Sequence, residues 1–191
     1  EILMKQKILI YLITIGVAMA IETPQYNILE KHGKVQVREY QTMAIAVTHV
    51  QRPYKIALNE GFRRIANYIF GGNDKEMKIA MTAPVISTQL NRDEETHEVF
   101  FVMPRDYHFD NLPNPNLQSV QLEKRKLSRV ATITFGGWAT EPRVKYFQDK
   151  LEQKMLELGL KRNGRIMVAQ YNSPWALPPF RKNEIIIQIK K

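Results

Sequence analysis

The predicted order of helices and strands is the same in the two halves of the chain, and this repeat constrains the fold most. In each half, two stretches of alternating apolar and polar residues precede a helical stripe, and two more follow it. The halves span about residues 26–104 and 120–189. The sequence therefore predicts an α+β fold: two β-β-α-β-β halves form an eight-stranded, mostly antiparallel curved sheet (a distorted barrel) with two helices.

Eight stretches are predicted as strands, four in each half. They are residues 34–40, 43–50, 77–88 and 98–103 in the first half, and residues 120–125, 129–135, 165–171 and 184–189 in the second. Residues 105–116 are rich in Pro and Asn and lack periodicity, which is typical of a linker. Because the chain has the usual length of one domain, we expect a single domain over residues 21–191.

Two further stretches carry apolar residues every three or four positions, as the buried face of a helix does. In the first stretch these residues are Leu58, Phe62, Ile65, Ala66 and Ile69. In the second they are Val144, Phe147, Leu151, Met155 and Leu158. Thr140 is expected to cap the start of the second helix, and Gly159 to end it.

The first 20 residues have the pattern of a secretory signal peptide. Lys5 and Lys7 precede an uncharged run of 13 residues, 8–20, which ends in Ala18-Met19-Ala20. A membrane-spanning helix needs about 20 apolar residues, so the run is short for a permanent anchor. We expect cleavage before Ile21, a periplasmic or secreted location, and no stable membrane insertion after cleavage. An uncleaved anchor or a buried helix is the alternative.

The composition excludes several kinds of site. The chain has no cysteine, which rules out disulfides, thiol catalysis, Cys-ligated zinc, iron–sulfur clusters and covalent c-type haem. The formal net charge of +9, from 28 basic and 19 acidic residues, favours anionic partners. The aromatic residues, however, are not interleaved with the basic clusters on one strand face, so we expect no nucleic-acid binding.

Common catalytic motifs are missing from the sequence. It contains no P-loop, no dinucleotide fingerprint, no G-x-S-x-G elbow and no HExxH. Of the four histidines, we single out His49 as a candidate metal ligand, because alternation places it on the same strand face as Ile45 and Val47. Six methionines either line an apolar ligand or fill the core: Met43, Met77, Met81, Met103, Met155 and Met167.

Several strings together resemble the SOUL haem-binding family. The most specific are Met81-Thr82-Ala83-Pro84-Val85 and Arg181-Lys182-Asn183-Glu184, and the others lie at 37–40, 61–73, 101–104, 135–138 and 171–175. The resemblance runs in order over residues 22–189. It implies a fold of two β-β-α-β-β halves and non-covalent binding of haem or a related tetrapyrrole, for sequestration or carriage, without an established reaction.

The resemblance also implies where the tetrapyrrole would bind. The family's groove lies beside the first helix, and the matching positions here are Asn59, Phe62, Ala66 and Asn67. We add Met81 and Trp175 as apolar contacts, and Arg63 and Arg181 as partners for propionates. These arginines could equally belong to a solvated surface.

The metal ligand remains open at this stage. A family member proposed to ligate iron uses a histidine where this chain has Glu39, and Asn59 and Asn67 stand where some relatives carry basic residues. We therefore expect a non-enzymatic module that binds a tetrapyrrole small molecule, with other flat amphipathic ligands as the alternative. An enzyme is disfavoured because no convergent acid–base or nucleophilic set is visible.

Overall fold

The computed structural model describes residues 21–91, 95–173 and 175–190, so the predicted signal peptide lies outside the described residues. The helices are α2 (Tyr54–Ile69) and α3 (Glu141–Glu157), and two short 3₁₀ turns are η1 (Phe109–Asn111) and η2 (Pro178–Phe180). The strands are β1 (Tyr26–His32), β2 (Val35–Gln51), β3 (Val85–Asn91), β4 (Thr96–Val102), β5 (Val120–Gly136), β6 (Arg162–Gln170) and β7 (Lys182–Ile189).

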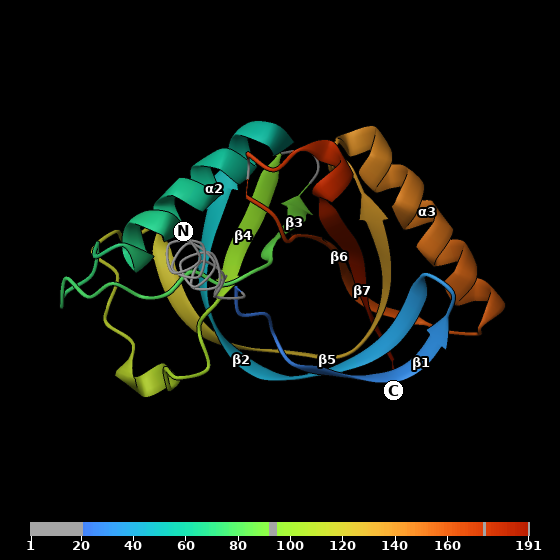
Figure 1. Ribbon diagram of the computed structural model, residues 1–191, viewed down its shortest axis with the longest axis horizontal. Helices are drawn as coiled ribbons and strands as arrows, with labels where there is room; N and C mark the ends of the chain where they lie inside the picture. Colours follow the sequence, from blue (N-terminus) through green and yellow to red (C-terminus); the bar gives the residue numbers. More distant parts are fainter. Residues whose placement is uncertain (1–20, 92–94, 174, 191) are drawn as a thin grey trace, which may run out of the picture.

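The strands form one antiparallel sheet that closes on itself. Its order is β1-β2-β4-β3-β6-β7-β5, and β5 pairs again with β2, so that six strands make a barrel and β1 extends it at one edge. The long strands β2 and β5 run across the whole molecule, and both helices lie on the same side of the barrel (Figure 1). The predicted α+β class, curved antiparallel sheet and two helices are thus confirmed.

The predicted number of strands is wrong: the described residues contain seven strands instead of eight. β2 and β5 were each expected as two strands, because their alternation changes phase midway. Tyr40 and Ile45 of β2 belong to the same core cluster, although residues five positions apart in a regular strand face opposite sides of the sheet. In β5 the same holds for Leu127 and Val130, on either side of Ser128 with φ +55°. The strand pairing continues past both points.

Two other strand predictions differ from the structure. β1 was not predicted, because most of its side chains are exposed and the apolar alternation is missing. The strand predicted from residue 77 begins only at Val85. The preceding segment makes isolated bridges, Phe70 with Lys78 and Glu22 with Thr82, and thereby runs beside the end of α2.

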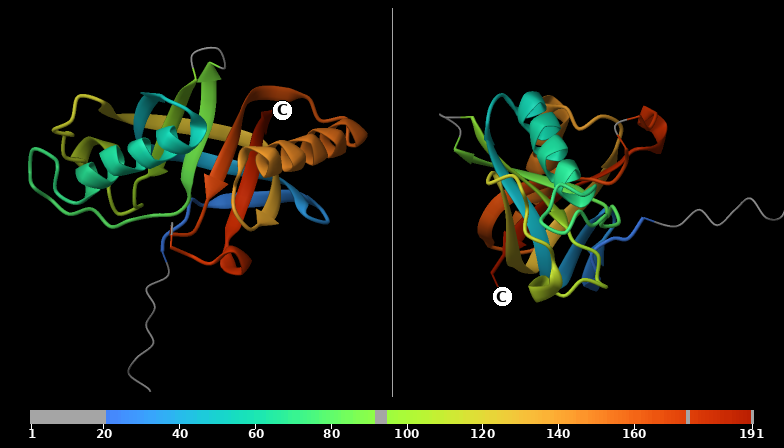
Figure 2. Two further views of the ribbon diagram at one scale, coloured as in Figure 1. Left: turned by 90° about the horizontal axis from the view of Figure 1, so that it is seen from above. Right: turned by 90° about the vertical axis from the view of Figure 1, so that its left-hand side faces the viewer.

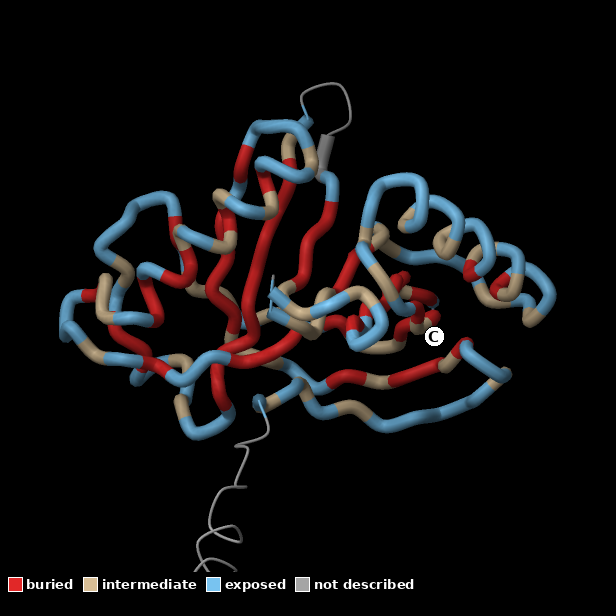
Figure 3. Tube along the Cα trace, turned by 45° about the horizontal axis from the view of Figure 1, so that its top comes forward, coloured by how far each residue is buried: buried red, intermediate tan, exposed pale blue. Residues whose placement is uncertain are grey.

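The core has three parts, and the buried residues concentrate in the strands (Figure 3). One cluster fills the barrel, a second lies under α3 and a third under α2. α2 packs closely: a Cβ added at Gly61 would lie 2.6 Å from Cγ2 of Val99 on β4. α3 buries only Leu151 and Met155. The first half has the order strand–strand–helix–strand–strand, from β1 to β4, and the second has the order strand–helix–strand–strand, from β5 to β7. That the halves are copies of one unit stays a prediction.

Candidate functional site

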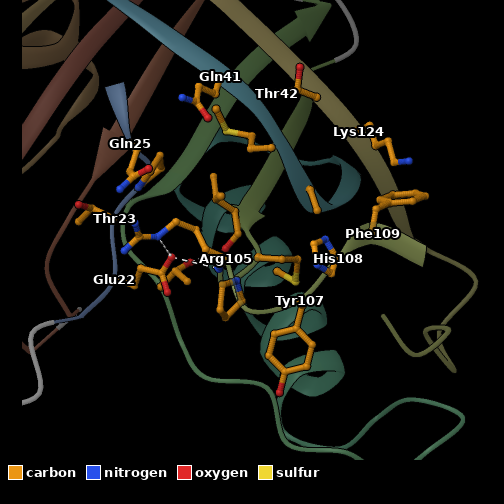
Figure 4. Close-up of a pocket in the computed structure, with 17 residues that line it drawn as sticks. Glu22, Thr23, Gln25, Gln41, Thr42, Arg105, Tyr107, His108, Phe109 and Lys124 are labelled. Carbon is orange, nitrogen blue, oxygen red and sulfur yellow. Dashed lines mark hydrogen bonds and ion pairs between the residues drawn. The ribbon is translucent and has the colours of Figure 1, made fainter. Parts of the chain in front are cut away.

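One pocket lies where three segments distant in sequence meet. The N-terminal residues 22–25, the middle of β2 at residues 41–44, and residues 102–109 after β4 line a cavity of about 260 Å³. Lys124 of β5 completes the wall. Glu22 and Arg105 lie on one side of the pocket, and His108, Phe109 and Lys124 on the other (Figure 4).

Arg105 and Lys124 line this pocket, and each has an acidic partner. Arg105 donates from its Nε at 2.8 Å and from its backbone N–H at 3.0 Å to the same Glu22 oxygen. The Lys124 ammonium lies 4.9 Å from the Phe109 ring centre and 3.6 Å from Asp110, whose side chain is largely exposed. Glu22 thus ties Arg105 to the N-terminal segment, while Lys124 is held only by contacts that water screens.

The pocket contains residue types that suit a tetrapyrrole, but it is small. Met43, Met103 and Phe109 supply soft apolar surface, and His108 and the methionine sulfurs are groups that ligate haem iron in proteins. Pockets that enclose drug-sized ligands usually measure about 300–1,000 Å³. This cavity alone therefore fits only the edge of a haem, but it adjoins a cavity of about 810 Å³ with which it shares Glu22, Gln41 and Arg105.

Five of the predicted contact residues lie on α2, on the flank away from β2 or on its outward face. The helix spacing brings Asn59, Phe62 and Ala66 together on that flank, with Arg63 next to them. Phe62 is half-buried, with its ring centre 5.6 Å from that of Phe101. Asn67 is exposed and its side chain covers Gly72, where an added Cβ would lie 2.1 Å from its Oδ1. The predicted helix therefore presents a mixed apolar and polar flank.

The two arginines of this region, neighbours in sequence, differ in their surroundings. Arg64 donates to the Thr48 hydroxyl at 3.3 Å and the His49 carbonyl at 3.0 Å, and it pairs with Glu60. It therefore belongs to the flank that faces β2. Arg63 is exposed and makes no ion pair among the described residues. Arg63 is thus an α2 cation that can reach a ligand on the Phe62 flank, and Lys55, four residues before Asn59, is another.

The remaining predicted residues come from other elements. Met81 is 38% exposed in the segment beside the end of α2, and Trp175 is 90% exposed in the loop between β6 and β7. Arg181 is buried: it donates to the Ala176 carbonyl at 2.8 Å, and its guanidinium lies 3.6 Å from the Trp138 ring centre. None of the eight predicted contact residues lines the pocket of Figure 4.

His49 lies at the edge of the barrel interior. Its side chain is 46% exposed, and its Nε2 is 3.6 Å from a Glu98 oxygen. In the described part of the chain, no group of three or more His, Asp or Glu side chains is arranged to hold a metal ion. Within the same residues, neither helix has the length and apolar character needed to cross a bilayer.

A buried charged network inside the barrel was not predicted. Arg38 donates to the two carboxylate oxygens of Glu184 at 2.8 and 2.9 Å, and Tyr171 and Thr134 donate to the same carboxylate at 2.7 and 3.1 Å. Burial alone would raise the pKa of Glu184, but the hydrogen bonds and charge of Arg38 hold it below its ordinary value. One sequence signal could have pointed to this network: Arg38 and Glu184 both lie in strings that resemble the SOUL family, 37–40 and 181–184.

The sequence comparison identifies the family. The chain matches the family described as SOUL heme-binding protein over residues 21–188. It belongs to the SOUL family. One relative is heme-binding protein 2 of Homo sapiens, which is 30% identical over 88% of this chain and 86% of that protein. Another is heme-binding protein 1 of Sus scrofa, 25% identical over 87% of this chain and 92% of that protein.

Solved structures share the fold of this SOUL chain at low identity. The C-terminal domain of EcmrR superposes with a TM-score of 0.64 at 12% identity, covering 87% of this chain and 98% of that domain. A hydrolase from Listeria innocua gives a TM-score of 0.61 at 11% identity, covering 85% and 94%. At these identities the likeness shows the fold alone.

Proposed function

We propose that this protein binds haem or a related tetrapyrrole non-covalently, for sequestration or carriage, and that it is not an enzyme. The observation that carries the proposal is the family match over residues 21–188, together with relatives named heme-binding proteins. The similarity covers 86% and 92% of the length of those two relatives, so it extends over the whole domain. Export through a cleaved N-terminal signal is part of the same proposal.

We propose that the tetrapyrrole ring lies on the Phe62 flank of α2. Phe62 supplies apolar surface there, and the exposed Arg63 supplies a cation for a propionate. Met81, 38% exposed in the segment beside the end of α2, is proposed as a further apolar contact. The ring of Phe62 is already backed by Phe101, so this surface is held rigidly before a ligand arrives. The close contact between Gly61 and Val99 fixes the helix on the sheet and supports the same conclusion.

Haem would be held here mainly by ring burial and propionate contacts, without strong ligation of the iron. Glu39 replaces the histidine of the family's proposed ligand, and a carboxylate is a poor axial partner compared with His, Met, Tyr or Cys. Iron-free protoporphyrin should therefore bind within about tenfold of haemin, or ~1.4 kcal/mol. A titration of each compound, followed by absorbance for haemin and fluorescence for protoporphyrin, measures that ratio.

The site is tested by haemin titration of single variants. Phe62→Ala should weaken haemin binding by about tenfold, and Arg63→Gln by up to about fivefold, because an exposed charge pair contributes at most ~1 kcal/mol. His108→Ala is the matched control in the pocket of Figure 4 and should bind haemin as the unmodified protein does. If His108→Ala alone weakened binding, the ring would belong in that pocket. If a panel of unrelated flat amphipathic molecules bound as tightly as haemin, haem affinity would be incidental.

A further inference from the structure

A second cleft, separate from the α2 flank, lies between the starts of the two helices. Pro53 and Tyr54 line it from α2, residues 141–148 from α3, and the sheet forms its floor, which includes Ser87 of β3, His97 of β4 and Val168 of β6. The N-terminal ends of α2 and α3 are the ends that approach one another (Figure 2). The cleft measures about 520 Å³, which is within the range of small-molecule sites.

Three buried polar atoms of this cleft have no hydrogen-bond partner among the described residues. They are the Tyr54 hydroxyl, the Ser87 hydroxyl and Nδ1 of His97. His97 is 3% exposed and Ser87 1%. In the β3–β4 pairing Ser87 is opposite Val99 and His97 opposite Gln89, so the two polar residues are diagonal neighbours on one face of the sheet. Their side chains are close to one another, yet neither buried polar atom has a hydrogen-bond partner among the described residues.

Buried polar atoms in proteins are nearly always satisfied, because an unpaired one is costly. The Tyr54 and Ser87 hydroxyls are close enough for Ser87 to oppose the rise in the pKa of Tyr54 that burial causes, yet no hydrogen bond of ordinary geometry joins them. Burial lowers the pKa of His97 despite the neighbouring carboxylates of Glu95 and Glu141. A neutral imidazole and two hydroxyls therefore face this cleft with unused hydrogen-bonding capacity.

Arg165 is the cation of the cleft that can meet an anion. Lys145, Arg162 and Arg165 line the cleft together with Glu95 and Glu141, and the first two of these cations have acidic partners. Lys145 pairs with Asp149, and Arg162 lies 3.5 Å from Glu152, whereas Arg165 makes no ion pair among the described residues. Pro53 and Thr140 precede the two helices without a side-chain cap hydrogen bond, so Thr140 occupies its predicted position without its predicted bond. Uncapped N–H groups at helix starts also favour negative charge.

We propose that this cleft binds a small organic carboxylate with an apolar body. Its carboxylate pairs with Arg165 and accepts hydrogen bonds from Ser87 and Tyr54, and His97 completes the polar floor. Val144, Ile166 and Val168 cover the apolar part. The site is independent of the proposed tetrapyrrole site, because none of the α2 flank residues lines it.

Titration with benzoate tests the proposal, followed by ¹⁵N NMR of the histidine side chains in the full chain. The His97 imidazole signals should shift in a saturable way, while those of His32 stay constant. Ser87→Ala and Arg165→Gln should each weaken benzoate binding at least about fivefold, the effect of losing roughly 1 kcal/mol. Lys31→Gln on β1 removes an exposed charge far from the cleft and should leave the affinity unchanged.

Three results would overturn the proposal. The first is the absence of a saturable His97 shift. The second is that Ser87→Ala and Arg165→Gln bind benzoate as tightly as the unmodified protein does. The third is that benzyl alcohol binds as tightly as benzoate. The benzoate-free spectra report whether each variant is folded, and Ser87→Ala removes a single oxygen. Haemin at saturation should not displace benzoate. Failure here would leave the haemin titration unaffected, so the two proposals fail separately.

Discussion

Two arginine–glutamate pairs border the interior of the barrel, with the same geometry and different surroundings. Arg38 donates to both Glu184 oxygens at 2.8 and 2.9 Å, and Arg125 to both Glu98 oxygens at 3.0 and 3.1 Å. The side chains of the first pair are 2% and 0% exposed, and those of the second 24% and 9%. Both carboxylates are thus buried, but the guanidinium of the second pair is partly exposed to water.

The partners around each pair explain how each charge is satisfied. Tyr171 and Thr134 donate to Glu184, so its carboxylate depends on protein groups alone. Arg125 also pairs with Glu123 at 2.7 Å, and Glu123 is more exposed. The same bidentate contact therefore contributes more to stability where water cannot replace the guanidinium than where water can.

The largest expected effect comes from removing one partner of the enclosed pair. Arg38→Met should lower the free energy of unfolding by about 3–5 kcal/mol, because the buried Glu184 charge keeps only one counter-charge, the half-exposed Lys182 ammonium 3.6 Å away. Urea denaturation at neutral pH measures the loss. The double variant Arg38→Met/Glu184→Gln should recover most of it, since the remaining amide can still accept from Tyr171. No recovery would mean that the loss comes from packing instead of charge.

A smaller effect is expected from acid, because protonation of Glu184 removes its charge and keeps its carboxyl group. The pKa of Glu184 is below its ordinary value in the folded state, so its ionised form stabilises the protein above the ordinary glutamate pKa of about 4.3. This stability is lost as the pH falls through the lower, folded pKa. Glu184→Gln should therefore be less stable than the unmodified protein at neutral pH, with the difference shrinking in acid. A constant difference in urea midpoints would contradict this.

The partly exposed pair should matter less. Arg125→Met is expected to lower the free energy of unfolding by about 1 kcal/mol, because the guanidinium and Glu123 are already partly exposed and water can enter the space that the guanidinium leaves beside Glu98. The same urea experiment serves as the measurement, and added salt should reduce the difference further. A loss equal to that of Arg38→Met would contradict the distinction between the two pairs.

The smallest effect is expected at His49, beside the Arg125–Glu98 pair. His49→Ala should change the free energy of unfolding by no more than about 0.5 kcal/mol, since its imidazole is half exposed and 3.6 Å from Glu98. It should also leave the haem absorbance spectrum unchanged. A low-spin, six-coordinate spectrum that vanished in His49→Ala would make this histidine the iron ligand.

Local patterns in the sequence predicted the helices well and the long strands poorly. The stripe of Ile65, Ala66 and Ile69 is buried as expected, because helical spacing reports one packed face. The phase change after Tyr40 imitates a strand end, although the pairing of β2 with β5 continues on both sides of it. Alternation records which face is buried, and it does not record whether the backbone continues.

Contacts between distant segments were beyond prediction for the same reason. The pocket of Figure 4 joins Glu22 to Arg105, and neither residue carries a local signal that names the other. Arg181 was chosen for its charge, but Trp138 from another element covers its guanidinium. The position of Phe62 was predictable because the apolar stripe of its helix is visible in the sequence. Its role toward a ligand stays a prediction, as do the roles of the other contact residues.

The pairing of β2 with β5 has a consequence for the synthesis of this protein. The ribosome completes β2, α2, β3 and β4 before β5 exists, so for that period one edge of β2 has no partner strand. An unpaired strand edge is a template for pairing with other chains. The half-made chain is therefore the stage most exposed to wrong association, and closure of the barrel waits for residues that are translated late.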